Sequence, residues 1–166
     1  MNRRAIDDAI SLRTEVAEDH EFLAELYAGT REEELRPVPW SDEEKKAFLR
    51  SQFEAQTLHY KEHYHAAEFW IIEKGGEAIG RLYLHHQRTD TRIVDIALVA
   101  QHRGSGIGGM LLGRVLGEAA AAGRSVSIHV EAYNPALRLY ERLGFRQIGM
   151  HGVYYLMEWR PENAAT

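Results

Sequence analysis

Residues 101–109 form a glycine-rich segment whose composition and spacing suit the binding of a phosphate group. The segment reads Gln-His-Arg-Gly-Ser-Gly-Ile-Gly-Gly, and Gly104, Gly106 and Gly109 repeat the spacing G-x-G-x-x-G. Glycine lets the backbone adopt positive φ and lets a ligand approach closely. The pattern alone favours two interpretations, an anion site and a set of glycines that pack a helix against a strand.

The residues on either side would place this segment between a strand and a helix. An apolar, β-branched run from Ile93 to Val99 precedes it and is typical of a buried strand. A helix start offers free N–H groups and the positive end of a dipole, so we expect a phosphate or pyrophosphate there. The helix that follows has an apolar face made of Ile107, Leu111, Leu112, Val115, Leu116 and Ala119.

A second informative segment follows an alternating strand and contains a short helix. Asn134 suits the N-cap of this helix, Pro135 its first position and Gly144 the residue just after its end. These residues place the helix at residues 136–143. Tyr140 lies on it, where its phenol could donate a proton or its ring could be part of the core.

Together the two segments resemble the GNAT superfamily of acyl-CoA-dependent N-acyltransferases. The resemblance rests on Q-x-x-G-x-G-I-G followed by V-x-x-x-N-P-A-x-x-L-Y-x-x-L-G-F, and it is close over residues 93–145. Residues 52–56 and 80–83 further resemble an uncharacterised bacterial subgroup, which names no substrate. The resemblance implies an α/β fold with a mixed, mostly antiparallel central sheet, splayed between two central parallel strands and flanked by helices.

The resemblance also implies acetyl-CoA as the acyl donor, with its pyrophosphate bound by backbone N–H groups of the glycine turn. Ile96 would bind the acetyl carbonyl through its backbone and stabilise the oxyanion of the reaction. Leu98 would pair with the pantetheine amide, and Asn134 would contact the pantetheine arm. The implied cofactor-binding residues are Ile96, Leu98, Gln101, His102, Arg103, Gly104, Ser105, Gly106, Ile107, Gly108, Gly109 and Asn134.

In the reaction that the resemblance implies, a bound amine attacks the thioester directly within a ternary complex. Tyr140 would then protonate the departing thiolate. The candidates for the general base are Asp95, His129 and Glu131, and a water-relayed base is an alternative. Because the chain has no cysteine, a covalent cysteine intermediate is excluded.

Asp95 and His129 each have a structural interpretation beside the catalytic one. Asp95 interrupts an apolar strand, where an unpaired carboxylate would be costly, so it needs a partner or a wet cavity. Arg81 and Arg92 are the candidate partners for an ion pair. His129 alternates with the apolar residues of its strand and could simply face solvent.

For the amine acceptor, the resemblance implies a pocket walled by the two early helices. Gln56 and Tyr60 have helical spacing on the second of them, while Arg81 and Tyr83 could reach the pocket from a strand. The alternative is that Tyr60 belongs to the core with Phe48 and Phe53, and that the glutamines, Gln52 among them, are solvated. The acceptor would be a small molecule or a peptide, and no motif identifies it.

Three histidines at 59, 63 and 65 suggest a metal site, because His59 and His63 are one helical turn apart. No carboxylate or cysteine completes a convincing ligand set. We therefore expect solvated or interface histidines and no metal.

Length and composition limit the remaining possibilities. The 166 residues suit one domain, and 45% hydrophobic and 27% charged residues are ordinary for a globular protein. A net charge of −5 argues against nucleic-acid binding, and no run reaches membrane-spanning length. We expect a cytoplasmic protein with one N-acetyltransferase domain at residues 1–160 and a disordered tail at 161–166, and a homodimer is one open possibility.

The same patterns predict the order of helices and strands. Ser41 and Glu44 form a capping box at the start of a helix that runs to about Tyr64, and Gly75-Gly76 predicts a hairpin turn. The other expected elements are a strand at 10–14, a helix at 17–31, strands at 69–73 and 78–85, a strand at 125–130, and strands at 146–150 and 153–159.

Two other classes of function are consistent with part of the sequence. A dinucleotide-binding oxidoreductase would use the same glycines, with Glu131 on the ribose. Four residues, 100–103, separate the strand from its first glycine, however, and too few residues follow for that fold. A non-catalytic acyl-CoA-binding sensor is the other alternative, and the presence of both Asn134 and Tyr140 argues against it.

Overall fold

The computed structural model describes residues 3–162 and divides into two compact units. The first contains the chain up to Leu82 together with Ala97–Arg103, and the second contains Tyr83–Ile96 and the chain from Gly104 onward. Most of the tail expected at residues 161–166 lies outside the described residues.

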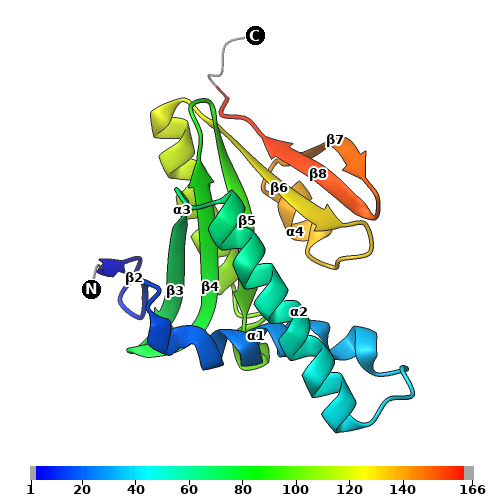
Figure 1. The fold of residues 1–166 in the computed structure, drawn as a ribbon. Coiled ribbons are helices and arrows are strands. Elements are labelled where there is room, and N and C mark those ends of the chain that lie inside the picture. Colours follow the sequence, from blue (N-terminus) through cyan, green and yellow to red (C-terminus); the bar gives the residue numbers. More distant parts are fainter. Residues whose placement is uncertain (1–2, 163–166) are drawn as a thin grey trace. The chain divides into compact units, whose positions relative to one another are not determined.

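The fold is mixed α/β, as the sequence predicts. In residues 3–162, eight strands form one sheet in the order β1-β2-β3-β4-β5-β6-β8-β7, which is mostly antiparallel and contains a parallel pair, β5 and β6 (Figure 1). The strands are β1 (Arg3–Ala5), β2 (Ile10–Thr14), β3 (Glu68–Lys74), β4 (Glu77–His86), β5 (Asp90–Leu98), β6 (Ser125–Glu131), β7 (Arg146–His151) and β8 (Tyr154–Trp159). The helices are α1 (His20–Leu35), α2 (Asp42–His63), α3 (Ile107–Ala122) and α4 (Leu137–Arg142), with 3-10 turns η1 (Ala17–Asp19) and η2 (Ala100–His102).

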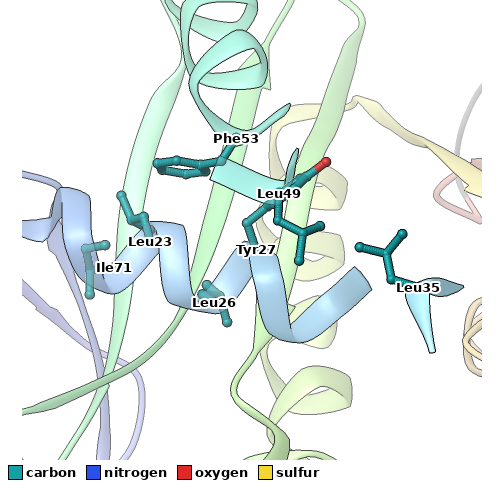
Figure 2. Close-up of a cluster of buried hydrophobic side chains, with 7 residues drawn as sticks. All are labelled: Leu23, Leu26, Tyr27, Leu35, Leu49, Phe53 and Ile71. Atoms are coloured by element: carbon teal, nitrogen blue, oxygen red, sulfur yellow. The ribbon is translucent and has the colours of Figure 1, made fainter. Parts of the chain in front are cut away.

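In the first unit, α1 and α2 pack together over β3. The buried cluster in Figure 2 takes its residues from all three elements: Leu23, Leu26, Tyr27 and Leu35 from α1, Leu49 and Phe53 from α2, and Ile71 from β3. The expected capping box of α2 is present, since Ser41 Oγ accepts from the Glu44 N–H at 3.1 Å and Glu44 Oε1 accepts from the Ser41 N–H at 3.1 Å. Phe53 is thus a core residue, whereas Phe48 is only partly buried beside the cluster.

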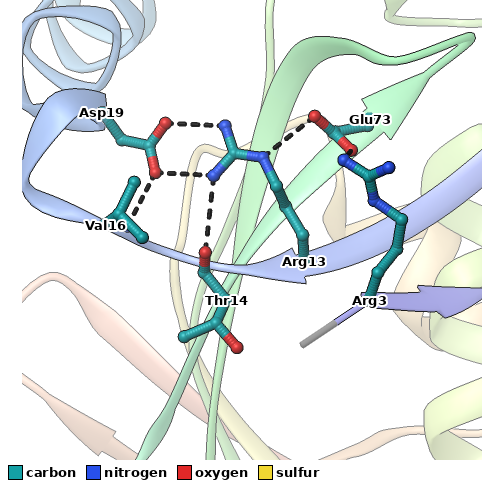
Figure 3. Close-up of polar contacts among 6 residues, drawn as sticks. All are labelled: Arg3, Arg13, Thr14, Val16, Asp19 and Glu73. Atoms are coloured by element: carbon teal, nitrogen blue, oxygen red, sulfur yellow. Dashed lines mark hydrogen bonds and ion pairs between the residues drawn. The ribbon is translucent and has the colours of Figure 1, made fainter. Parts of the chain in front are cut away.

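A buried ion network, which the sequence analysis missed, fixes β2 to the elements beside it (Figure 3). The Arg13 guanidinium donates to both oxygens of Asp19, at 2.7 and 2.8 Å, and its Nε donates to Glu73 Oε2 at 2.9 Å. Glu73 Oε1 lies 3.0 Å from Arg3 Nη2. Arg13, Asp19 and Glu73 are all buried, so removing one of them would leave an uncompensated charge in the interior.

In the second unit, the apolar face expected for α3 is buried. All six of its predicted residues, Ile107, Leu111, Leu112, Val115, Leu116 and Ala119, are among the buried residues of α3. Gly123, with φ of 69°, ends the helix in the left-handed conformation that glycine adopts without strain. This packing holds the first residue of α3 directly after the glycine turn.

Most element boundaries agree with the sequence analysis within a few residues, and four features differ from it. The strand β1 was not expected, the first helix begins as η1 and continues to Leu35, and β5 begins at Asp90 rather than Ile93. The start of α4 also differs, because its N-cap is Ala136 and not Asn134. Within residues 3–162, no helix is both long and apolar enough to cross a membrane.

Candidate functional site

The central feature of the second unit is the place where the two parallel strands part. Strands β5 and β6 pair over four residues, from Asp90↔Ser125 to Ile93↔Ile128, and over the described residues their ladder ends there (Figure 1). Strand β6 continues to pair with β8 as far as Glu131. Every residue of β5 from Val94 onward is partly exposed, in contrast to the buried Ile93. Beyond Ile93 the backbone groups of β5 that face β6 therefore have no partner in β6, and an extended ligand could bind them as an added strand would.

The glycine turn follows β5 and leads directly into α3. Gly104 and Gly106 have φ of 74° and 88°, values that L side chains rarely adopt, and Gly106 is the N-cap of α3. No side chain caps this helix start. The N–H groups of its first turn have no acceptor within the helix, so they can bind an anion. Among the other predicted residues, Gln101 and His102 lie in η2, and Arg103 Nε donates to the Leu98 carbonyl at 2.9 Å.

Tyr140 combines a buried ring with a hydroxyl that makes no hydrogen bond within residues 3–162. The side chain lies on α4, is 5% exposed and meets Phe145 edge-on, with ring centroids 5.5 Å apart. Burial raises the pKa of the Tyr140 phenol well above its ordinary value, and the carboxylates of Asp95 and Glu131 raise it further. The three residues predicted to be catalytic are therefore close enough to interact, and Tyr140 stays protonated at neutral pH.

Asn134 caps the turn that precedes α4 and also contacts Glu131. Its Oδ1 accepts from the Ala136 N–H at 2.9 Å, and its side-chain amide donates to Glu131 Oε2 at 3.0 Å. The predicted N-cap role of Asn134 is therefore wrong: its side chain closes the turn before the helix, while Ala136 is the N-cap of α4 and α4 begins at Leu137. The hydrogen bond from Asn134 orients the carboxylate of Glu131, one of the candidate bases.

The ion pair considered for Asp95 with Arg92 does not form in the described part of the chain. Arg92 donates to Ser127 Oγ at 2.8 Å and to His129 Nδ1 at 3.2 Å instead. Asp95 is half-buried on β5. His129 is exposed, as one of the two interpretations of its alternation requires.

In the first unit, three of the residues predicted for the acceptor pocket contact one another. Arg81, only 3% exposed, donates from Nη2 to Gln56 Oε1 at 2.8 Å, and its guanidinium carbon lies 6.0 Å from the centre of the Tyr60 ring. The fourth, Tyr83, is buried and belongs to the second unit.

Gln52 is half-buried and takes part in a polar cluster between α1 and α2. Arg31 Nη1 donates to Gln52 Oε1 at 2.9 Å and to the Tyr27 hydroxyl at 2.6 Å. Tyr27 and Arg31 were not predicted as polar neighbours of α2, although their spacing of four residues places them on one face of α1.

The exposed histidines of α2 stack rather than converge. The rings of His59 and His63 lie 4.2 Å apart at 28°, and His63 Nδ1 contacts the His59 carbonyl at 3.0 Å. Residues 3–162 contain no group of three or more His, Cys, Asp or Glu side chains that could hold a metal ion.

The family model for the Acetyltransferase (GNAT) family matches residues 18–145, which include the glycine turn, both parallel strands and Tyr140. The chain belongs to the GNAT acetyltransferase family. No curated protein matches the sequence. The similarity to solved structures is low in sequence and extends over nearly the whole fold.

Three solved structures illustrate this similarity. The PaiA N-acetyltransferase of Thermoplasma acidophilum in complex with coenzyme A has a TM-score of 0.71 at 18% identity, covering 92% of this chain and 99% of that one. An acetyl transferase of Salmonella typhimurium that modifies the N-terminal serine of a ribosomal protein has a TM-score of 0.64 at 17% identity, covering 95% and 96%. A chimeric spermidine N-acetyltransferase of Vibrio cholerae SpeG and hSSAT has a TM-score of 0.64 at 20% identity, covering 92% and 96%.

Acetyl-CoA as the acyl donor fits this GNAT family, in which a structure has been solved with coenzyme A. The residues present here suit such a ligand. The uncapped start of α3 offers donors for a pyrophosphate, and β5 beyond Ile93 offers backbone groups for the amides of a pantetheine arm.

Proposed function

We propose that this protein is an acetyl-CoA-dependent N-acetyltransferase that transfers the acetyl group to an amine by direct attack in a ternary complex. Residues 1–160 would act as one catalytic domain. The observation that carries the proposal is the end of the β5–β6 ladder at Ile93 and Ile128, on the strand that leads into the glycine turn. The family match to residues 18–145 supports it.

The backbone of the chain would hold the acyl donor. N–H groups of the turn and of the first turn of α3, from Gly104 to Gly109, bind the pyrophosphate, and Leu98 pairs with the pantetheine arm. The Ile96 N–H donates to the acetyl oxygen, where negative charge develops during attack. Acetyl-CoA itself supplies the activated thioester.

Tyr140 would donate a hydrogen bond to the sulfur as it becomes a thiolate. Its raised pKa keeps the proton in place but makes complete transfer to a less basic thiolate unfavourable. Asp95 and Glu131 contribute to that raised pKa, so protonation of either one would lower it. If one of these carboxylates accepts the proton of the attacking amine, release of the Tyr140 proton becomes easier in the same step.

The acceptor would bind at Gln56, Tyr60, Arg81 and Tyr83. Within the first unit, Gln56 orients the buried Arg81 guanidinium, which has further N–H groups that can donate to a polar acceptor. The activities of two of the similar proteins suggest two acceptor classes to test, a polyamine and a peptide N-terminus.

The first experiment is calorimetric titration of the purified protein with acetyl-CoA, with NAD as the control ligand. We expect micromolar binding of acetyl-CoA and at least a tenfold weaker affinity in Ser105→Glu, because a carboxylate would stand beside the phosphates. Ala121→Glu is the matched control, since it adds the same charge about 20 Å along α3. Equal affinity of Ser105→Glu and the wild type would remove the anion site from the turn, and binding of NAD instead would overturn the proposal.

Turnover is then tested by release of free thiol from acetyl-CoA with spermidine or with a short peptide as the amine. Because the chain contains no cysteine, every thiol detected comes from coenzyme A. Thiol release with either amine supports an enzyme. Tight binding of acetyl-CoA without turnover over a broad panel of amines would instead indicate a non-catalytic sensor.

A further inference from the structure

Three basic side chains of the second unit gather beside the point where β5 and β6 part. Arg92 precedes the last paired residue of β5, His129 follows the last paired residue of β6, and His151 ends β7. The strand register places them on one face of the sheet, because paired residues share a face and so do residues two apart in a strand. Arg92 pairs with Ser127, two residues before His129, which pairs with Leu156. Tyr154, two residues before Leu156, pairs with His151. We call these three residues the arginine–histidine cluster.

The members of the cluster contact one another through a hydrogen bond to an unprotonated ring nitrogen and through a contact between two imidazole rings. Arg92 Nη1 donates to His129 Nδ1 at 3.2 Å, so that nitrogen carries no proton, and the rings of His129 and His151 lie 5.6 Å apart. Partial desolvation of its ring lowers the pKa of His129, although the residue as a whole is exposed, and the charges of Arg92 and His151 lower that pKa further. The imidazole of His129 is therefore neutral at pH 7, next to a permanent cation.

In the described part of the chain no carboxylate contacts the cluster directly, and the nearest link is the Ser127 hydroxyl, which accepts from Arg92 Nε and donates to Asp90. Asp90 accepts the hydroxyls of Ser125 and Ser127 at 2.7 and 2.5 Å, Glu158 accepts from Arg160 at 2.6 Å, and Glu131 accepts from Asn134 at 3.0 Å. The side-chain partners of Arg92 in residues 3–162 are Ser127 and His129, and Arg92 is half-buried, while His129 and His151 are exposed. The other ionisable side chains of this face include Arg146 and Tyr154 on β7 and β8, and His85 on β4, whose neighbour His86 contacts Thr91 on the opposite face.

We propose that Arg92, His129 and His151 form a binding site for a small oxyanion, a carboxylate or a tetrahedral anion such as sulfate or phosphate. The guanidinium can bind two oxygens of such a group, and both imidazoles can become donors by taking up a proton. When the anion binds, His129 Nδ1 gives up the hydrogen bond from Arg92 and takes up a proton. The protonated ring then donates to the anion. Anion affinity then rises as the pH falls through the pKa of His129. This site goes beyond the proposed acetyl transfer and does not depend on it.

The test is an NMR titration of the imidazole C–H signals of His129 and His151 in the full chain. Each titration runs from pH 5 to 8 in sodium chloride, in sodium sulfate and in sodium acetate at matched ionic strength. Sulfate keeps its charge over this range, so any change in the titration midpoint belongs to the protein. We expect sulfate or acetate to raise the midpoint of His129 by about half a pH unit, and the stronger of the two identifies a tetrahedral anion or a carboxylate.

Two variants separate a site from a general salt effect. Arg92→Gln should raise the titration midpoint of His129 in chloride, because it removes a neighbouring cation. The same substitution should lower the affinity for the anion about tenfold, so that sulfate and acetate shift the midpoint far less. Arg160→Gln removes an arginine that is already paired with Glu158 and should leave the anion effect unchanged. The proposal is overturned if His129 titrates identically in all three salts, or if Arg92→Gln responds to the anions as the wild type does. Unchanged amide spectra show that both variants fold.

Discussion

At the residue scale, the structure makes the strongest case for Tyr140, whose hydroxyl is protonated, without a hydrogen bond in the described residues, and close to two acids. We predict that Tyr140→Phe lowers kcat by about 10²- to 10³-fold, the usual scale for losing a proton donor. The free energy of unfolding should change by less than about 1 kcal/mol, because the lost hydroxyl bonds no other group of the protein. Thiol release and urea unfolding measure the two effects.

The control for this variant is Tyr154→Phe, which removes an exposed hydroxyl from β8 and should leave kcat unchanged. A loss of less than threefold in Tyr140→Phe would reject its role at the sulfur. Because the pKa of Tyr140 is raised, it stays protonated below pH 10, and any change of kcat between pH 5 and 9 belongs to another group.

The buried carboxylate of Asp19 makes a prediction about stability rather than activity. The hydrogen bonds from Arg13, and then the Val16 N–H, hold the pKa of Asp19 below its ordinary value in spite of burial. This stabilisation is present above the pKa of the unfolded chain, about 4, and is lost as the pH falls through the lower folded value. Asp19→Asn should therefore lower the free energy of unfolding by about 3 kcal/mol at pH 7, because Arg13 then keeps one carboxylate partner, Glu73.

Urea unfolding at a series of pH values checks this prediction. The difference between the wild type and Asp19→Asn should stay constant from pH 5 to 8 and narrow below about pH 4. Glu18→Gln changes a neighbouring exposed acid and serves as the control. A difference that is independent of pH down to pH 2 would show that the lost stability comes from packing and not from the ion network.

At the element scale, Gly80 shows how closely β4 and the end of β5 approach. A Cβ on Gly80 would lie 2.2 Å from the Ala97 carbonyl oxygen and 2.9 Å from Leu98 Cδ2, and the oxygen belongs to backbone that cannot rotate away. We predict that Gly80→Ala lowers the free energy of unfolding by about 3 kcal/mol. Gly29→Ala, on α1 with no atom within 4 Å of its Cβ, should instead raise it by about 0.5 to 1 kcal/mol. Equal effects of the two substitutions in thermal unfolding would contradict this account.

The elements themselves could be predicted from the sequence wherever a local signal exists. Such signals arise from contacts between near neighbours in the chain. They include the capping box at Ser41, the glycine pair at residues 75–76 and the apolar face of α3. The three-residue strand β1 was missed because it is short and largely exposed, which leaves no apolar pattern. The Arg13 network was missed because Arg13 and Glu73 are 60 residues apart, and no local rule links them.

The candidate site was predictable to the same extent. Where binding depends on backbone N–H groups, the sequence contains recognisable glycine or asparagine residues, so the turn and Asn134 could be predicted. Tyr140 could be predicted because it belongs to the motif that contains Asn134. The cluster of Arg92, His129 and His151 has no such signature, because it depends on the register of β5, β6 and β7. Acceptor residues are equally hard to find, since Gln56 and Arg81 meet only through tertiary packing.

At the scale of the whole molecule, binding of acetyl-CoA must add to the stability of the folded chain. A ligand at about 100 times its Kd that binds only the folded state adds about 2.7 kcal/mol to the free energy of unfolding. For a chain of this length, this corresponds to a rise in Tm of about 5 to 10 °C. The rise should grow with the logarithm of ligand concentration, which thermal scans over a hundredfold range of acetyl-CoA would show.

Comparison of variants in the same scans separates binding from chemistry. Tyr140→Phe should keep the full rise in Tm, because its hydroxyl is assigned to the departing sulfur and not to the pyrophosphate. Ser105→Glu should lose most of the rise, while Ala121→Glu keeps it. If Tyr140→Phe and Ser105→Glu lose the rise together, Tyr140 contributes to binding the donor. Its effect on kcat would then reflect a misplaced thioester rather than the loss of a proton donor.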